Sequence, residues 1–431
     1  MKRIAALLLL VLGASTLFAQ PPTAFTQNPP VAPILSPAER SMAQARKLIE
    51  KNPKDFEAYN ALALALSRRA RETSDVTCNT QGEEALQKSF ALSPDNFDGQ
   101  RIQTWLLLGK HEFAAALQAA TKLNHRMPDD LMSYGFLTDA NVELGNYKEA
   151  EIAAQWMLDL RAGNMPGLTR AAYLRELFGD IDGSLELMNM AYQSTPPTEF
   201  EDGAWIVTQM AHLNLAMGKI EEAEALSRQA LDMFPNYHYA LANLAKVRIR
   251  QKRYEEAVDL LRQRYQAASH AENLFDLAHA LQLAGHQDEA QRAFAEFEQK
   301  SLLETNRADN SNHELVFYYA DYANQPAKAL EVARREYARR HDVFTLDCYA
   351  WALHLNGQND EAIKQISTAL AVGIRDARLF WHAGEIELAA GDHGAAEHYL
   401  RQSAELNSLG SDEARVALAR LVQPAAGGMV P

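Results

Sequence analysis

Histidine and carboxylate side chains recur in the C-terminal half of the chain. They are the residues in this sequence that are best suited to catalysis or metal binding. His279, Asp321, Asp347, His354 and Glu385 could form a metal site or an acid–base pair, because imidazole and carboxylate groups are zinc ligands and proton carriers. They come from separate segments, however, and none belongs to a compact metal-binding motif such as HExxH. Scattered polar residues on a solvated surface explain them equally well, so we expect no catalytic residue, metal or cofactor.

The remaining chemical patterns are weaker. His382 lies three residues before Glu385, whereas His393 falls in a turn and His398 on the following helix, so joint coordination of one ion is not expected. The sequence contains no GxxxxGK[ST], no GxGxxG after a strand and no GxSxG. A phosphate-cradling loop or a nucleophile on a strand-to-helix turn therefore has no support.

The segments that must position these residues have a helix-forming composition and a regular period. From Ser36 onward Ala, Leu, Glu, Gln and Arg predominate, which favours helices. Turn positions recur at spacings of 34, 39, 34, 33, 39, 33 and 34 residues: Gly145, Gly179, Gly218, Lys252, Gly285, Asn324, Gly357 and Gly391. Five residues after each turn stands a small side chain: Ala150, Ser184, Ala223, Ala257, Ala290, Ala329, Ala362 and Ala396. Small residues at a fixed distance from a turn allow two antiparallel helices to approach closely.

This combination resembles the tetratricopeptide repeat family, and with the leader described below it points to an exported repeat protein of the bacterial type. The clearest unit is 131–164, and the likeness covers roughly 38–407 with a period of about 34 residues. The resemblance implies an all-α fold, a right-handed superhelical solenoid of about ten antiparallel helix pairs. Family members mostly act as scaffolds that hold segments of partner proteins on the inner surface. Seven residues before the turn, six of the eight repeats have Ala or Gly, but the eighth repeat has Phe317 there and Asn-Gln-Pro in place of a glycine turn at 324–326; these departures predict a distorted eighth repeat.

The resemblance also implies where a partner binds, because the first helix of each repeat lines the inner surface. Positions ten and six residues before the turn, supplemented by thirteen and three, give a candidate partner-binding groove: His212, Lys246, Phe275, His279, Tyr318, Asp321, Asp347, Trp351, His354, Trp381 and Glu385, with Gln282 and Glu314 on the same face. Aromatic anchors with carboxylates between them suit a peptide that carries Lys or Arg and apolar side chains. Packing of Trp and Tyr between neighbouring helices is the alternative. The unit 131–164 offers only Gly135 and Asp139 at its main inner positions, so we expect binding in repeats seven to ten.

The composition divides the chain into segments. Residues 1–19 combine Lys2 and Arg3 with an apolar run and a small residue at Ala19, the order of a secretory signal peptide. We therefore expect an exported, periplasmic or secreted protein without an integral membrane segment after cleavage. Residues 20–36 form a Pro-rich linker and 37–130 irregular repeats, in which 71–82 looks like a polar insertion. The regular array occupies 131–410, a capping helix 411–422 and a disordered tail 423–431. Two 39-residue intervals predict longer loops at 196–200 and 305–309.

Charge and cysteine content narrow the class of partner. The formal net charge is -14, and it becomes -14 - 2 = -16 when Lys2 and Arg3 leave with the signal, which disfavours nucleic acid and anionic membrane surfaces. Cys78 and Cys348 lie many repeats apart, so we expect two unpaired thiols.

These observations predict a non-catalytic scaffold that binds a protein or peptide on its concave groove, in the cell envelope or outside the cell. Two alternatives remain open. One is a metal- or small-ligand-dependent enzyme or sensor that uses the same groove, and the other is a structural spacer. The identity of the partner and the oligomeric state do not follow from the sequence.

Overall fold

The computed structural model of the chain describes residues 35–406, 408 and 410–422. In this part the chain folds into α-helices and one π-helical turn, without a strand, and the portion from Ser36 onward forms one compact unit. The predicted signal peptide, nearly all of the Pro-rich linker and the predicted disordered tail lie outside the described residues. No helix in the described ranges has the length and apolar character needed to cross a membrane.

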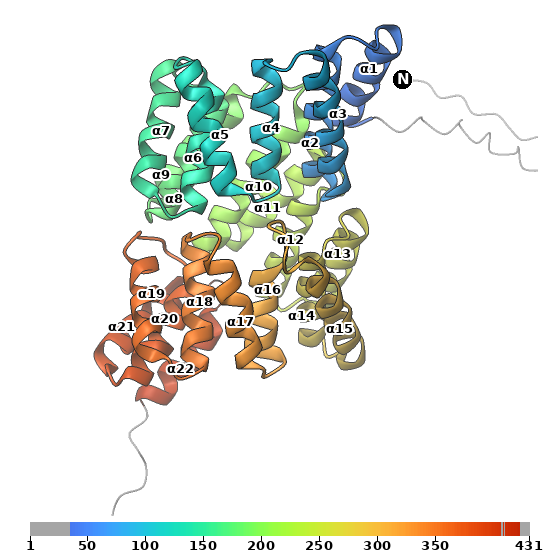
Figure 1. The fold of residues 1–431 in the computed structure, drawn as a ribbon. Helices are drawn as coiled ribbons and strands as arrows, with labels where there is room; N and C mark the ends of the chain where they lie inside the picture. Colours follow the sequence, from blue (N-terminus) through green and yellow to red (C-terminus); the bar gives the residue numbers. More distant parts are fainter. Residues whose placement is uncertain (1–34, 407, 409, 423–431) are drawn as a thin grey trace, which may run out of the picture. The chain divides into compact units, whose positions relative to one another are not determined.

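The helices follow one another in antiparallel pairs (Figure 1). They are α1 (Pro37–Lys51), α2 (Phe56–Thr73), α3 (Thr77–Leu92), α4 (Phe97–Gly109), α5 (Phe113–Arg126), α6 (Leu131–Glu143), α7 (Tyr147–Leu160), α8 (Met165–Leu177), α9 (Ile181–Ser194), α10 (Phe200–Ala216), α11 (Ile220–Met233), α12 (His238–Arg250), α13 (Tyr254–Ala267), α14 (Ala271–Leu283), α15 (Gln287–Glu304), α16 (Asn312–Phe317), η1 (Tyr318–Tyr322), α17 (Pro326–Tyr337), α18 (Val343–Leu355), α19 (Asn359–Leu370), α20 (Ala377–Ala390), α21 (His393–Leu406) and α22 (Ser411–Val422).

The predicted repeat register is confirmed at every turn. All eight turn positions have a left-handed backbone, with φ between 50° at Asn324 and 88° at Gly391. The eight small residues that follow them are buried, and none is more than 2% exposed. A larger side chain there would separate the two helices of a repeat, because helix interfaces are close-packed. The fold is an all-α repeat solenoid.

The two longer intervals and the distorted repeat are also present. One loop separates α9 from α10, and the other separates α15 from α16. The helix that carries Phe317 breaks after six residues and continues as the π-helical turn η1. Phe317 is 9% exposed, so a bulky ring occupies the place where other repeats have a small residue. The extra residue in a π-turn provides the room.

The prediction of a polar insertion at 71–82 is wrong. Helix α2 continues to Thr73 and α3 begins at Thr77, so the first repeat is an ordinary helix pair. Ser74 adopts a left-handed φ of 53° and makes the turn without a glycine. The carboxylate of Asp75 accepts hydrogen bonds from the amide and hydroxyl of Thr77, at 3.0 and 2.7 Å, which holds the chain in position to start α3.

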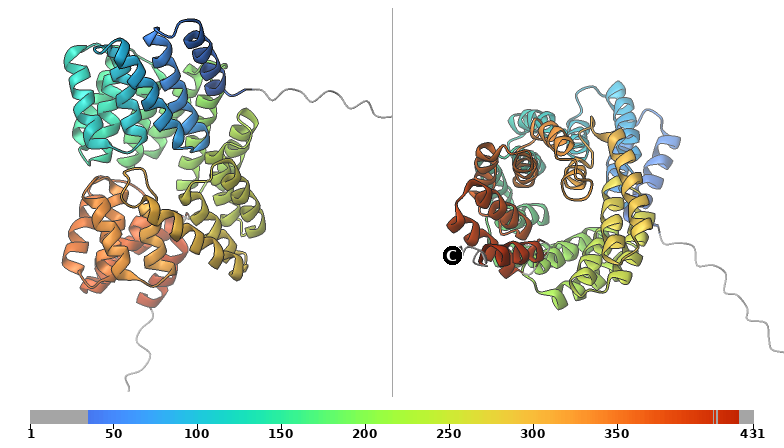
Figure 2. Two further views of the ribbon diagram at one scale, coloured as in Figure 1. Left: turned by 45° about the vertical axis from the view of Figure 1, so that its right-hand side comes forward. Right: turned by 90° about the horizontal axis from the view of Figure 1, so that it is seen from below.

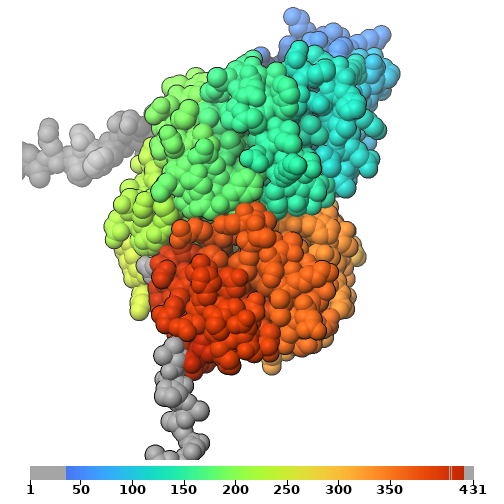
Figure 3. Space-filling view, turned by 90° about the vertical axis from the view of Figure 1, so that its left-hand side faces the viewer, coloured from blue at the N-terminus to red at the C-terminus, as the bar shows by residue number. Residues whose placement is uncertain are grey.

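Successive turns of this solenoid touch each other (Figures 1 and 2). The amide of His341, between α17 and α18, donates to the carbonyl of Glu143 at the end of α6 at 3.1 Å. The amide of Val343 donates to the hydroxyl of Tyr147 at 2.9 Å. A Cβ on Gly179, in the α8–α9 turn, would lie 2.5 Å from the carbonyl oxygen of Gly373. The space-filling view shows this contact as a continuous seam (Figure 3).

The last described helix, α22, packs on the final repeat. Ala414 and Ala417 cover Leu400 of α21 in a small apolar cluster. This arrangement shields the apolar side of the array at its C-terminal end, as repeat proteins require.

Candidate partner-binding surfaces

Two cavities are lined by inner-face residues, and the larger of the two, of about 1000 Å³, lies inside the first five repeats. Its walls come mainly from the first helix of each pair, α2, α4, α6, α8 and α10. When Ser74 and His111 are taken as turn positions, the residues thirteen, ten, six and three places before them all line it: Ala61, Leu64, Arg68, Arg71, Asp98, Arg101, Trp105 and Leu108. Both turn residues have left-handed φ, so the inner-face register extends into the irregular repeats.

Apolar side chains provide much of the open surface of this cavity. Leu64 is 40% exposed, and half-buried Trp105, Met132, Met165 and Trp205 stand on four other helices around the same space. Such a surface gains free energy when an apolar partner covers it, and Trp is frequent among the residues that dominate binding.

Charged side chains in the wall are paired with one another. The guanidinium of Arg170 donates to both carboxylate oxygens of Asp139, at 2.8 and 2.6 Å. Arg101 lies 3.2 Å from a carboxylate oxygen of Asp130. Because these charged side chains already have partners, the wall has no preference for a positively or a negatively charged ligand.

A cluster of ion pairs closes this wall between α2 and α10. Arg71 contacts Glu201 and lies 2.6 Å from Asp202, and Arg68 lies 3.3 Å from Glu199. The hydroxyl of Tyr237 donates to the second carboxylate oxygen of Glu201 at 2.7 Å. The loop before α10, one of the two predicted longer loops, thus supplies an acidic partner for the first repeat.

A smaller cavity, of about 290 Å³, contains three of the predicted groove residues. His212, Lys246 and Asp347 line it together with Glu314, which the same register selects. The imidazole Nε2 of His212 lies 2.8 Å from a carboxylate oxygen of Glu176. Burial lowers the pKa of Lys246, while burial raises the pKa of Glu314 to about 7.

A second group of predicted residues forms a packed polar chain instead of an open surface. Trp351 is 6% exposed and donates its indole N–H to Asp321 at 2.9 Å. Its ring stacks on His382 with centroids 4.3 Å apart, and His382 Nδ1 lies 2.8 Å from Asp347. His354 and Trp381 pack against the same indole. Burial raises the pKa of Asp321, and His382 and Trp351 oppose that rise.

His382 is the member of this polar group that the inner-face register does not select, although its spacing from Glu385 is visible in the sequence. It is fully buried, and it lies nine residues before Gly391, which is not an inner-face offset. The signal that could have found it was its position beside Trp381 on the helix that faces Trp351.

The remaining predicted residues pack in the C-terminal core. Phe275 is 8% exposed and contacts Phe297 with ring centroids 5.2 Å apart. Tyr318 stacks on Phe294 at 5.4 Å. His279 is half-buried and burial lowers its pKa, whereas Glu385 lies half-buried on α20. The structure therefore does not bring all eleven residues onto one surface.

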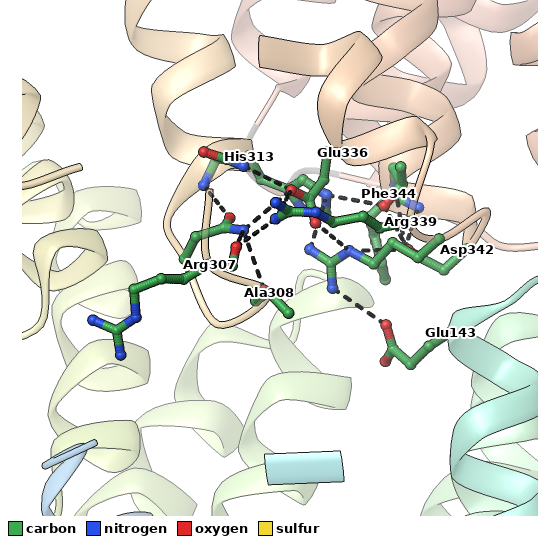
Figure 4. A network of polar contacts seen from close by, with 12 residues as sticks. Glu143, Arg307, Ala308, His313, Glu336, Arg339, Asp342 and Phe344 are labelled. Carbon is green, nitrogen blue, oxygen red and sulfur yellow. Dashed lines mark hydrogen bonds and ion pairs between the residues drawn. The ribbon is translucent and has the colours of Figure 1, made fainter. Parts of the chain in front are cut away.

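The seam between turns carries a polar network of its own (Figure 4). Arg340 lies 3.3 Å from Glu143 of α6 and 3.2 Å from Glu336 of α17, and it donates to His313 Nε2 at 3.1 Å. Burial, followed by the nearby Arg340, lowers the pKa of His313 to about 4. Burial raises the pKa of Glu143 to about 7, and Asp342 adds to the rise. Arg339 donates to the carbonyl of Asn306 at 2.9 Å and holds the second longer loop.

The predicted His and carboxylate residues are not gathered for metal binding. Among the residues that the structure describes, no three His, Cys, Asp or Glu side chains are placed to hold one ion. Cys78 and Cys348 are both buried and both free.

Comparison with known proteins identifies the repeat type. Tetratricopeptide-repeat family models match residues 214–264 and 350–410. No curated protein matches the chain. These two matches coincide with the confirmed turn register around Gly218, Lys252, Gly357 and Gly391.

Solved structures with a similar fold include those of three different proteins. PilW, a type IV pilus biogenesis factor, is 13% identical over 49% of this chain and 93% of its own, with a TM-score of 0.40. TTC0263, a TPR protein of Thermus thermophilus, is 18% identical over 44% and 99%, with a TM-score of 0.38. A human IFIT1 dimer with PPP-AAAA is 13% identical over 86% and 95%, with a TM-score of 0.48. The family models identify tetratricopeptide repeats at 214–264 and 350–410, and the turn register continues the same helix-pair geometry through the other regular repeats.

Proposed function

We propose that this protein is a non-catalytic scaffold that binds a segment of a partner protein inside the larger cavity. The observation that carries the proposal is the cavity of about 1000 Å³ lined by the inner helices of five successive repeats. Its volume is at the upper end of what small-molecule sites offer, roughly 300–1000 Å³, and it is built from continuous helices. Of the predicted groove, His212, Lys246 and Asp347 remain candidates for contact with a ligand.

The chemistry of the wall favours an apolar segment of the partner. Arg101 and Arg170 already have carboxylate partners, so a strongly charged peptide would have to break pairs that exist in the free protein. Leu64, Trp105 and Trp205 instead offer surface that a Leu, Met or aromatic side chain of the partner would cover. We infer that apolar anchors contribute most of the affinity and that hydrogen bonds set the register.

Site-specific crosslinking tests this assignment. A photoreactive amino acid at Leu64 or Gln209, both in the cavity wall, should capture the same polypeptide in the native host. The matched control is Ile152, an apolar residue that is 51% exposed on α7 and does not line the cavity. Mass spectrometry would identify the captured chain.

The outcomes separate the competing functions. Capture from Leu64 and Gln209 but not from Ile152 supports a scaffold that uses this cavity. Equal capture from Ile152 would place binding on the outer surface, and no capture from any position would favour a structural spacer. Leu64→Glu should then weaken binding of the identified partner at least about tenfold, because it places a charge against the apolar anchors, whereas Ile152→Glu should not.

We also propose that the scaffold works after export. The order of charged, apolar and small residues in 1–19 supports this location. Mass spectrometry of the protein purified from its host should find an N-terminus close after Ala19, in the periplasm or the medium. An intact Met1 in the cytoplasmic fraction would refute it.

A further inference from the structure

The smaller cavity is lined by three cations that form no ion pair with the described residues. Lys246, Arg375 and Arg378 all line it, and among the described residues no carboxylate oxygen lies within the 4.0 Å that defines an ion pair with any of them. Arg250, a fourth cation of the lining, lies 3.1 Å from Asp412. Unmatched cations stand out in a chain with a net charge of -14.

The acidic residues of the same cavity make their short contacts with other groups, although the effect of burial on the pKa of Arg378 is still outweighed by Asp376 and Asp347, which raise it. Asp347 pairs with His382 at 2.8 Å. Asp376 caps α20 and accepts a hydrogen bond from the amide of Leu379 at 2.9 Å. Burial, with Glu272 adding to it, raises the pKa of Glu314 to about 7, so its carboxyl group is only partly ionised near neutral pH. In the lining, the four cations Lys246, Arg250, Arg375 and Arg378 outnumber the three carboxyl groups of Glu314, Asp347 and Asp376, so the cavity retains a positive charge that an anion can match.

The surroundings of two cations suit an oxyanion. Lys246 and Arg378 are half-buried, and a cation out of water is stabilised by a charged hydrogen-bonding partner. The guanidinium of Arg378 lies over the ring of Phe317 at 4.6 Å. Stacking of this kind occupies one face of the guanidinium and leaves its N–H edges free for the oxygens of an anion.

We propose that the smaller cavity binds a phosphate-type oxyanion through Lys246, Arg375 and Arg378. The three cations come from α12, from the loop before α20 and from α20 itself, so they approach from different elements. A tetrahedral dianion presents oxygens in more directions than a planar carboxylate and matches three cations better in charge. The cavity, at about 290 Å³, is larger than a free phosphate ion. The group is therefore either inorganic phosphate or the phosphoryl group of a larger ligand.

Calorimetric titration of the full-length protein with inorganic phosphate, at constant ionic strength and pH 7.5, tests the site. We expect saturable binding that weakens at least about tenfold in Lys246→Gln and in Arg378→Gln, because each removes a charge-assisted hydrogen bond. Arg161→Gln, at an exposed position after α7, is the matched control and should bind like the unmodified protein. Circular dichroism checks the fold, and Lys246→Gln provides the test if loss of the Phe317 contact destabilises Arg378→Gln.

Two further titrations identify the source of the group. O-phosphoserine that binds more tightly than inorganic phosphate indicates a phosphoryl group on a larger ligand, whereas equal or weaker binding indicates the free ion. Acetate or pentaglutamate that competes as well as phosphate would overturn the preference for a tetrahedral dianion. Absence of saturable phosphate binding, or equal binding by Lys246→Gln, would overturn the site itself. None of these results bears on partner binding in the larger cavity, because the proposed oxyanion site lies in the other cavity.

Discussion

Gly384 shows how closely the two helices of a repeat pack at one residue. A Cβ at this position would lie 2.6 Å from Leu400 Cγ and 3.3 Å from the carbonyl oxygen of Ala396. Gly394, ten residues later on α21, has only Asp392 nearby, at 3.5 Å. The same residue type therefore has opposite roles on neighbouring helices, and two substitutions can separate them.

We expect Gly384→Ala to destabilise the protein by about 1–3 kcal/mol through overpacking. Gly394→Ala should instead be neutral or stabilising by up to about 1 kcal/mol, because alanine has the higher helix propensity. Urea unfolding followed by circular dichroism measures both. Equal effects of the two changes would show that helix propensity, not helix approach, decides the stability at Gly384.

His238 predicts a specific response to acid. It is 1% exposed, its Nε2 lies 3.1 Å from the carbonyl oxygen of Arg71, and burial lowers its pKa from 6.5 to about 4. Between pH 6.5 and 4 the unfolded chain binds a proton at this imidazole that the folded chain does not, so the contribution to stability falls as the pH falls. The total loss is about 3 kcal/mol.

The variant His238→Gln should lose less stability than the unmodified protein over this interval. Urea midpoints at several pH values from 7 to 4 measure the difference. His393→Gln, at an exposed position, is the control and should follow the unmodified protein. If His238→Gln loses as much stability as the unmodified protein, His238 is protonated in the folded state without a cost.

Whether a single residue is open to a ligand is harder to predict than its position on the inner face. The offset from the turn selects His212, Lys246 and Asp347, which line the smaller cavity. The same offset selects Trp351, which is covered by His382 of the next repeat. Neighbouring repeats determine which inner positions stay open, and that information is not local in the sequence.

At the level of secondary-structure elements, the left-handed turn residue determines how much of the repeat pattern can be recognised. Eight turns are recognisable because glycine or a matching spacing marks them, and their small contact residues repeat. The first two repeats look irregular in the sequence because Ser74 and His111 replace glycine at the left-handed position, with φ of 53° and 59°. The larger cavity, which these two repeats help to build, could not be predicted for that reason.

Left-handed turns also allow a test by exchange of residue type. Lys252 holds a φ of 58°, a conformation that costs a residue with a Cβ roughly 1–2 kcal/mol. Lys252→Gly should therefore raise stability by up to about 1 kcal/mol, after the larger entropy of the unfolded glycine is counted. Gly285→Ala should lower it by about 1 kcal/mol. A Cβ at Gly285 has no neighbour within 4 Å, so only the backbone conformation at φ 84° is tested. Differential scanning calorimetry would detect both changes, and the reverse order of stability would contradict the argument.

For the whole molecule, the sequence predicts a solenoid of helix pairs but not the contact between its turns. The period determines how one repeat stacks on the next. The closing contacts join residues such as Arg71 and Glu201, or Glu143 and Arg340, which lie far apart in the chain. One longer loop contributes to these contacts through Glu199. The other, which Arg339 holds, lines a pocket together with Asn79 and Lys110 of the first two repeats. A pattern that describes nearest neighbours cannot predict them.

Arg71 and Arg68 allow the closing contact to be measured. Arg71→Ala should cost about 3 kcal/mol, because it leaves Glu201, which is 4% exposed, without its cation. Arg68→Ala should cost less than about 1 kcal/mol, since Arg68 and Glu199 are both about one-third exposed and the second contact of Arg68, with Asp202, is longer, at 3.5 Å. Thermal unfolding of both variants gives the comparison. Similar losses would mean that the buried pair contributes no more than a surface pair.

The closed wall between α2 and α10 has a topological consequence for any partner. Because ion pairs join the first repeat to the fifth, charged side chains close the larger cavity at that point, and a polypeptide laid into it from the side would have to break them. Threading a free end or a slender loop along the axis leaves these pairs intact. Exchange of partners should therefore be governed by insertion and withdrawal of that segment, and fusing a bulky folded domain to the inserted end of a partner should abolish binding without altering a single contact residue.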